Sequence, residues 1–92
     1  MDYSLKQDGF ELLVEAEKER VKEEILSSYI NLRKKKGITQ QQNADLTGMQ
    51  RTNIVRIESG RYSPSIEVLV KLAAALDMDI EIRLVERKSG DE

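Results

Sequence analysis

Residues 40–60, with the sequence QQQNADLTGMQRTNIVRIESG, decide the fold. Two short helices are expected in this stretch, one over residues 40–47 and one over residues 51–59, with Gly60 ending the second. The first is opened by a capping box, because Thr39 is a good helix cap and Gln42 follows it three residues later. Only residues 48–50 connect the two helices, so they must cross at a steep angle, and Gly48 supplies the positive φ that so tight a turn needs.

The second of these helices carries two different faces. Ile54 and Ile57 lie three residues apart and are expected to point into the core, and Ala44 leaves room for the close approach of the two helices. The opposite face contains two arginines that can bind in a bidentate manner, a hydroxyl and a methyl-bearing side chain: Arg51, Thr52, Val55 and Arg56. Such a set can read base edges in a DNA major groove, although a solvated polar helix face would look the same.

Outward from this centre, the flanks extend the helical pattern and then change it. An uninterrupted helix is expected from Phe10 to Lys36, with its apolar residues on one face and Gly37 as its stop. Ser63-Pro64 is expected to open a further helix, as a cap followed by proline at the first helical position. After residue 77 the apolar residues recur at every second position. Ile80, Ile82 and Leu84 alternate with charged residues, which predicts a strand over residues 79–85.

Composition excludes several classes of function. The chain has no cysteine and no histidine, so it lacks the thiolate and imidazole ligands of zinc and the commonest general base. We therefore expect no enzyme activity, no metal and no cofactor. No apolar run approaches the ~20 residues of a membrane span, and the first residues lack the features of a signal peptide, so a soluble cytoplasmic protein without membrane contact is expected.

The net charge of −2 conceals a basic middle. Residues 1–24 hold four Lys/Arg and eight Asp/Glu, residues 25–76 hold eight and three, and residues 77–92 hold three and six. The segments therefore carry −4, +5 and −3. The basic segment contains the two short helices, which fits a nucleic-acid partner.

Several motifs in register resemble the XRE family of DNA-binding regulators, the Cro and phage-repressor type. They are Leu32-Arg33, Gly37-Ile38-Thr39-Gln40, Ala44, Gly48, Ile54, Arg56-Ile57-Glu58-Ser59-Gly60, Pro64-Ser65 and Leu72-Ala73-Ala74-Ala75-Leu76. The resemblance implies that Arg51, Thr52, Val55 and Arg56 contact bases and that the DNA backbone is contacted by Gln40, Gln50, Asn53, Ser59, Arg61 and Tyr62. It also implies a structural ion pair between Arg33 and Glu58.

Three residues depart from this family pattern. Asn43 occupies the place of a core leucine, Thr47 is less apolar than usual, and Gln50 replaces the Ser or Thr cap of the recognition helix. Asn43 is expected to be tolerated at the rim of the domain, and the alternative is that Asn43 and Gln50 reach toward DNA. The run from Lys34 to Lys36 serves the helix dipole and solubility, or else contacts phosphates.

The resemblance implies an all-α, five-helix repressor-like domain over residues 25–77. Residues 1–24 form an N-terminal helical extension, and residues 78–92 a C-terminal strand and tail. The expected function is a sequence-specific transcriptional repressor that binds double-stranded DNA at an operator as a homodimer, with Ile80, Ile82 and Leu84 as the dimerisation residues.

The alternative function comes from the two ends of the chain. They resemble the antitoxins that bind RelE-like ribonuclease toxins and repress their own operons. In that case Phe10, Leu13 and Val14 would form a docking surface for a small toxin protein, whereas otherwise they would pack on their own domain or on the dimer mate.

Overall fold

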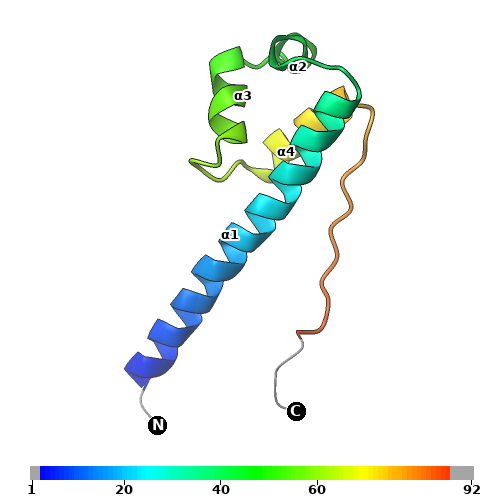
Figure 1. The fold of residues 1–92 in the computed structure, drawn as a ribbon. Coiled ribbons are helices and arrows are strands. Elements are labelled where there is room, and N and C mark those ends of the chain that lie inside the picture. The colour runs from blue at the N-terminus through cyan, green and yellow to red at the C-terminus, as the bar shows by residue number, and fades with distance from the viewer. Residues whose placement is uncertain (1–2, 88–92) are drawn as a thin grey trace.

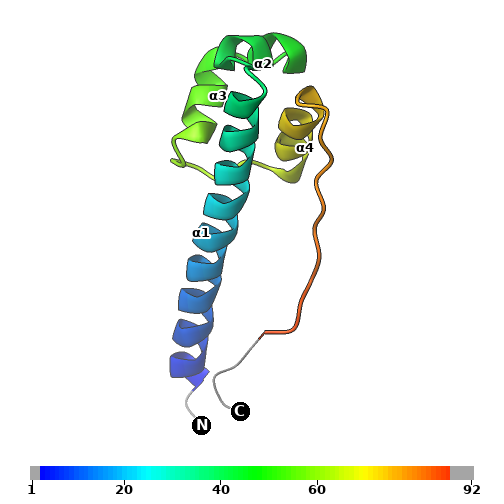
Figure 2. The ribbon, with the colours of Figure 1, turned by 45° about the vertical axis from the view of Figure 1, so that its right-hand side comes forward.

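The computed structural model describes residues 3–87 and shows one long helix that carries three short ones at one end (Figure 1). The elements are α1 (Tyr3–Lys35), α2 (Gln40–Thr47), α3 (Arg51–Glu58) and α4 (Ile66–Ala75). The N-terminal half of α1 projects away from the short helices, and residues 78–87 run back beside it in both views (Figures 1 and 2). We call this projecting half, residues 3–24, the arm, and residues 78–87 the tail.

The expected five-helix fold with a C-terminal strand is wrong. Residues 3–87 contain four helices and no strand. The expected extension and the first helix of the domain are one continuous helix, because nothing between Tyr3 and Lys35 interrupts it. Residues 79–85 have the alternation of a strand but lie beside no backbone edge with which to pair, and alternation by itself fixes only which side chains are buried. Residues 1–2 and 88–92, at the ends of the expected extension and tail, lie outside the described residues.

Caps set the helix ends. The capping box at Thr39 is confirmed: its Oγ1 accepts from Gln42 N at 3.0 Å, and Thr39 N donates to the Gln42 side chain at 2.8 Å. Gly48, the C-cap of α2, has φ 76°, as the tight turn requires. α4 begins later than expected, because the cap is Ser65, which accepts from Val68 N, and not Ser63.

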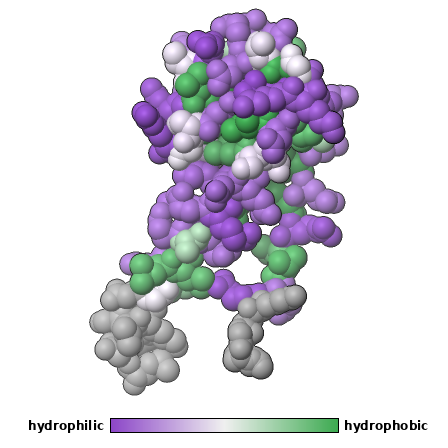
Figure 3. All heavy atoms as spheres, viewed as in Figure 1, coloured by the Kyte–Doolittle hydropathy of each residue, from purple (hydrophilic) through white to green (hydrophobic). Residues whose placement is uncertain are grey.

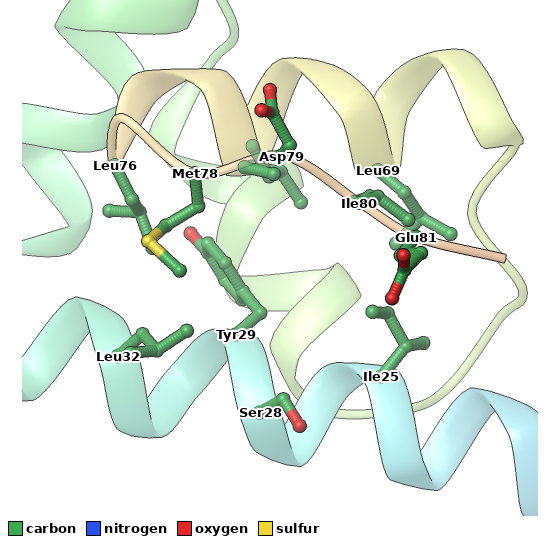
Figure 4. A pocket seen from close by; sticks show the side chains of 12 residues that line it. Ile25, Ser28, Tyr29, Leu32, Leu69, Leu76, Met78, Asp79, Ile80 and Glu81 are labelled. Atoms are coloured by element: carbon green, nitrogen blue, oxygen red, sulfur yellow. The ribbon is translucent and has the colours of Figure 1, made fainter.

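The core lies where the short helices meet the C-terminal half of α1. Its buried apolar residues come from all four helices: Leu26, Tyr29, Ala44, Ile54, Ile57, Leu72 and Leu76. The start of the tail adds to it over an apolar pocket of about 150 Å³ between α1 and α4. Figure 4 shows Met78 turned toward Tyr29 and Leu32, Ile80 beside Leu69, and Asp79 pointing away. The tail therefore has an inward and an outward side without being a strand.

Asn43 lies at the centre of this core and not at its rim. It is fully buried, its amide nitrogen donates to the Tyr29 hydroxyl, and its Oδ1 has no hydrogen-bond partner among the described side chains. Burial, and then the negative charge of Glu58, raises the pKa of Tyr29 to about 12, so its hydroxyl is neutral at physiological pH. Asn43 therefore neither sits at an edge nor reaches outward.

We expect the pair of substitutions Tyr29→Phe and Asn43→Leu to be at least neutral for stability. Tyr29→Phe alone should lower the free energy of unfolding by about 1–3 kcal/mol, because the buried amide then loses its partner as well. The double variant removes the whole polar pair, including the unpartnered oxygen, and should regain that loss. Urea denaturation of both variants and the original chain measures this. A double variant less stable than Tyr29→Phe would mean that packing volume, not hydrogen bonding, governs this site.

Candidate nucleic-acid interface

α3 presents one continuous polar face to solvent. Ile54 and Ile57 are completely buried, and this fixes the rotation of the helix about its axis. All four residues expected to contact bases are consequently exposed: Arg51, Thr52, Val55 and Arg56. The sequence thus located the outward face correctly, while the contacts assigned to it stay predictions.

Residues expected to contact a DNA backbone surround this face. Gln50, Asn53, Ser59, Arg61 and Tyr62 are exposed, on α3 or in the segments that flank it. Gln50 is the N-cap of α3 but makes no side-chain capping hydrogen bond, so its amide is available to an outside partner. The Ser59 hydroxyl, by contrast, donates to Arg56 O at 2.6 Å and so helps to end α3.

A buried ion pair holds α3 against α1. Arg33 donates to Glu58 through Nε at 2.8 Å and through Nη2 at 2.9 Å, and its Nη1 donates to Ile38 O at 2.8 Å. The two side chains are only 8% and 9% exposed. This is the Arg33–Glu58 pair that the family resemblance implied, in a bidentate geometry that fixes both distance and orientation.

Gln40 joins the same network, which the sequence did not predict. Its side-chain amide donates to Glu58 Oε1 at 3.0 Å, from the first residue of α2. The Thr39 cap binds the N–H of Gln42, and the N–H groups of the first two helical residues remain directed outward from the N-terminus of α2. An anion such as a phosphate would find free N–H donors there.

Lys22 is a further residue that sequence analysis missed. Its ammonium group donates to Gly60 O at 3.0 Å and also pairs with Glu19 at 3.2 Å, and its side chain is 12% exposed. It ties the arm to the loop that follows α3. The contact spans 38 positions along the chain, and no local pattern signals it.

Residues 3–87 contain no helix long and apolar enough to cross a membrane. Within the same range no three His, Cys, Asp or Glu side chains are grouped so that they could hold a metal ion.

The Helix-turn-helix family model matches residues 30–82, which include α2, α3 and α4. The ImmF control region 10 kDa protein of Bacillus phage phi105 is 37% identical over 65 residues, which cover 64% of this chain and 72% of that protein. An "Uncharacterized HTH-type transcriptional regulator" of Methanothermobacter thermautotrophicus is 43% identical, covering 48% of this chain and 64% of its own length. A protein of the same name from Haemophilus influenzae is 36% identical over a segment that covers 63% of this chain and 59% of that protein.

A solved structure resembles nearly the whole chain. It is described as a toxin–antitoxin module from Streptococcus pneumoniae, with a TM-score of 0.62 and 28% sequence identity. The match covers 83% of this chain and 80% of the other, so it extends beyond the segment matched by the family model.

Proposed function

The chain belongs to the helix-turn-helix family of DNA-binding transcriptional regulators, and we propose that it is a repressor that reads its operator through the exposed face of α3. In this proposal Arg51, Thr52, Val55 and Arg56 contact base edges. Gln40, Gln50, Asn53, Ser59, Arg61 and Tyr62 contact the sugar-phosphate backbone. Lys34 and Lys35 lie in the last turn of α1 and Lys36 follows it, and in this proposal all three serve the helix dipole.

The observation that carries this proposal is the exposed polar face of α3 on a rigidly held helix. Two buried isoleucines fix the rotation of α3, and the Arg33–Glu58 pair fixes its position against α1. A side chain whose orientation is set before binding loses less conformational entropy when it contacts a base, so more of the contact energy is available for discrimination. This function requires no catalytic group. A cytoplasmic location, together with the operator DNA, stays a prediction.

Selection from a random pool of DNA duplexes tests the proposal. The full chain should enrich a two-fold symmetric sequence whose half-sites lie about one helical turn, roughly 34 Å, apart. Affinity for that sequence should fall steeply as salt rises, because each phosphate contact releases counterions. Enrichment of no sequence above the starting pool would contradict a sequence-specific regulator.

We propose that the operator-binding species is a homodimer. Sequence analysis assigned dimerisation to Ile80, Ile82 and Leu84, and that assignment stays a prediction. Ile80 is half-buried against its own chain, whereas Ile82 is 67% and Leu84 100% exposed. Substitution of both exposed residues, Ile82→Asp with Leu84→Asp, should abolish the dimer in sedimentation if the tail holds it, and leave it intact if another surface does.

A second candidate function is that of an antitoxin which binds a RelE-like toxin and represses its own operon. The observation in its favour is the likeness to a toxin–antitoxin module over 83% of this chain. A small basic ribonuclease-like protein encoded by the neighbouring gene, co-expressed with this chain, should co-purify with it and be inhibited by it. If the two proteins do not associate, the antitoxin function is contradicted and only the repressor function remains.

A further inference from the structure

Lys22 joins the arm to the segment between α3 and α4, residues 59–65, which we call the α3–α4 loop. The loop passes beside α1 in both ribbon views (Figures 1 and 2). The Lys22 ammonium group donates to Gly60 O at 3.0 Å and pairs with Glu19 at 3.2 Å, and the side chain is only 12% exposed. A lysine so little exposed is normally paired, and here both acceptors belong to the chain itself.

The α3–α4 loop has few other hydrogen bonds. Among the described residues, the main chain of residues 61–64 makes a single one, from Arg61 N to the Ser59 hydroxyl at 3.4 Å. An open groove of about 480 Å³, lined in part by Ser63 and Pro64, lies between this part of the loop and the arm. On the face shown in Figure 3, the surface of the arm just below the short helices is largely hydrophilic. The bond from Lys22 is thus the hydrogen bond that ties the loop to the arm in the described chain.

The carbonyl group that Lys22 binds sets the direction of Arg61. Gly60 has φ 77°, and glycine is the residue with the greatest backbone freedom. Its carbonyl oxygen, the Arg61 nitrogen and the Arg61 Cα lie in one peptide plane. A hydrogen bond that holds the oxygen therefore also holds the point from which the exposed Arg61 side chain leaves the backbone.

We propose that Lys22 positions Arg61 for contact with a DNA phosphate. The inference rests on the proposed function, in which Arg61 contacts the DNA backbone, and it adds a residue of the arm to that function. Lys22 lies outside residues 30–82, the segment that the Helix-turn-helix family model matches. It is a positioning residue, because its ammonium group is held within the chain and the phosphate is bound by Arg61.

Lys18 provides a matched control for Lys22. It lies one turn earlier on the arm and pairs with Glu15 at 3.2 Å, as Lys22 pairs with Glu19 at 3.2 Å. Its side chain is 49% exposed, and among the described residues it makes no hydrogen bond to the α3–α4 loop. Methionine at either position removes one positive charge and keeps most of the aliphatic stem. The difference between the two variants therefore reports the contact with Gly60 O.

DNA binding by the full chain tests the inference, with a duplex of random sequence as well as the selected operator. Lys22→Met should weaken both complexes by about fivefold and lower the salt dependence by about one unit, because a phosphate contact is lost. Lys18→Met should stay within about twofold of the original chain, since salt screens an exposed charge. Lys22→Arg can still donate to Gly60 O and should bind as the original chain does. Circular dichroism and urea denaturation check that each variant is folded. Equal effects of Lys22→Met and Lys18→Met would overturn the inference.

A double-mutant cycle separates positioning from a direct contact between Lys22 and DNA. If Lys22 acts through Arg61, the variant with both Lys22→Met and Arg61→Ala should bind at most about twofold more weakly than Arg61→Ala alone. A phosphate contact made by Lys22 itself would instead multiply the two losses and overturn the inference. The losses of Lys22→Met and Arg51→Ala should multiply, because Ile54 and Ile57 fix the rotation of α3 independently of the loop. Equal coupling of Lys22 to Arg51 would place its effect on α3 as a whole and would also contradict the inference.

The effect of Arg61→Ala distinguishes failure of this inference from failure of the proposed function. If Arg61→Ala leaves DNA binding unchanged while Arg51→Ala weakens operator binding, Arg61 does not contact DNA. The inference is then wrong, and recognition through α3 stands. If the chain binds neither the selected nor the random duplex, the proposed function and the inference fail together.

Discussion

Replacing Arg33 by alanine is expected to lower the free energy of unfolding by about 3–5 kcal/mol. Arg33 makes three hydrogen bonds, two to the carboxylate of Glu58 and one to Ile38 O, and both charged side chains are more than 90% buried. Its removal leaves the Glu58 carboxylate buried beside neutral groups, the Gln40 amide and the Tyr29 hydroxyl. The cost is therefore that of an uncompensated buried charge and not merely of a lost attraction.

A double-mutant cycle with Arg33→Ala and Glu58→Gln measures this coupling by urea denaturation. The double variant should be more stable than the sum of the single losses predicts, because it leaves no lone charge. Arg33→Lys should lose much of the stability as well, since an ammonium group cannot reproduce the bidentate contact. Lys71→Ala is the matched control: its pair with Glu67 is exposed, at 51% and 79%, and its loss should cost no more than about 0.5 kcal/mol. Additive losses at Arg33 and Glu58 would refute the pair as a stabilising unit.

Features set by neighbouring residues could be predicted from the sequence. The capping box at Thr39 and the turn at Gly48 depend on contacts within a few positions, and both are present. The rotation of α3 follows from the spacing of Ile54 and Ile57. The Arg33–Glu58 pair joins residues 25 positions apart, and it could be predicted only from the resemblance to a family.

Features set by distant contacts escaped prediction. The alternation of residues 79–85 indicates an inward and an outward side, but a strand also needs a second strand to pair with, and the other described residues form only helices and connecting loops. A polar amide can sit at the rim of a small domain, and this is the basis of the rim expectation for Asn43, yet Tyr29, 14 positions away, accepts its hydrogen bond in the core. The contact of Lys22 with Gly60 O likewise has no local signature.

Replacing both Arg51 and Arg56 by alanine is expected to abolish discrimination between the operator and random DNA. Both side chains are exposed on one face of α3, one at its first residue and the other in its last turn. A bidentate arginine contact to guanine contributes about 1–3 kcal/mol of discrimination, so each single variant should lose roughly 5- to 150-fold in operator affinity. A homodimer makes each contact twice, so the combined loss in the double variant should be larger still.

Competition separates base contacts from phosphate contacts. Operator binding is measured with and without an excess of random duplex, over a range of salt. A base-reading arginine weakens operator binding and leaves binding to random DNA nearly unchanged, whereas a phosphate-binding arginine weakens both and reduces the salt dependence by about one unit per contact. Lys71→Ala, at an exposed position of α4, controls for the loss of a positive charge as such. Since both arginines lie outside the core, the variants should unfold at the same urea concentration as the original chain. Equal losses on operator and random DNA would make Arg51 and Arg56 phosphate ligands, and unchanged binding to both would exclude the outer face of α3 as the surface that reads DNA.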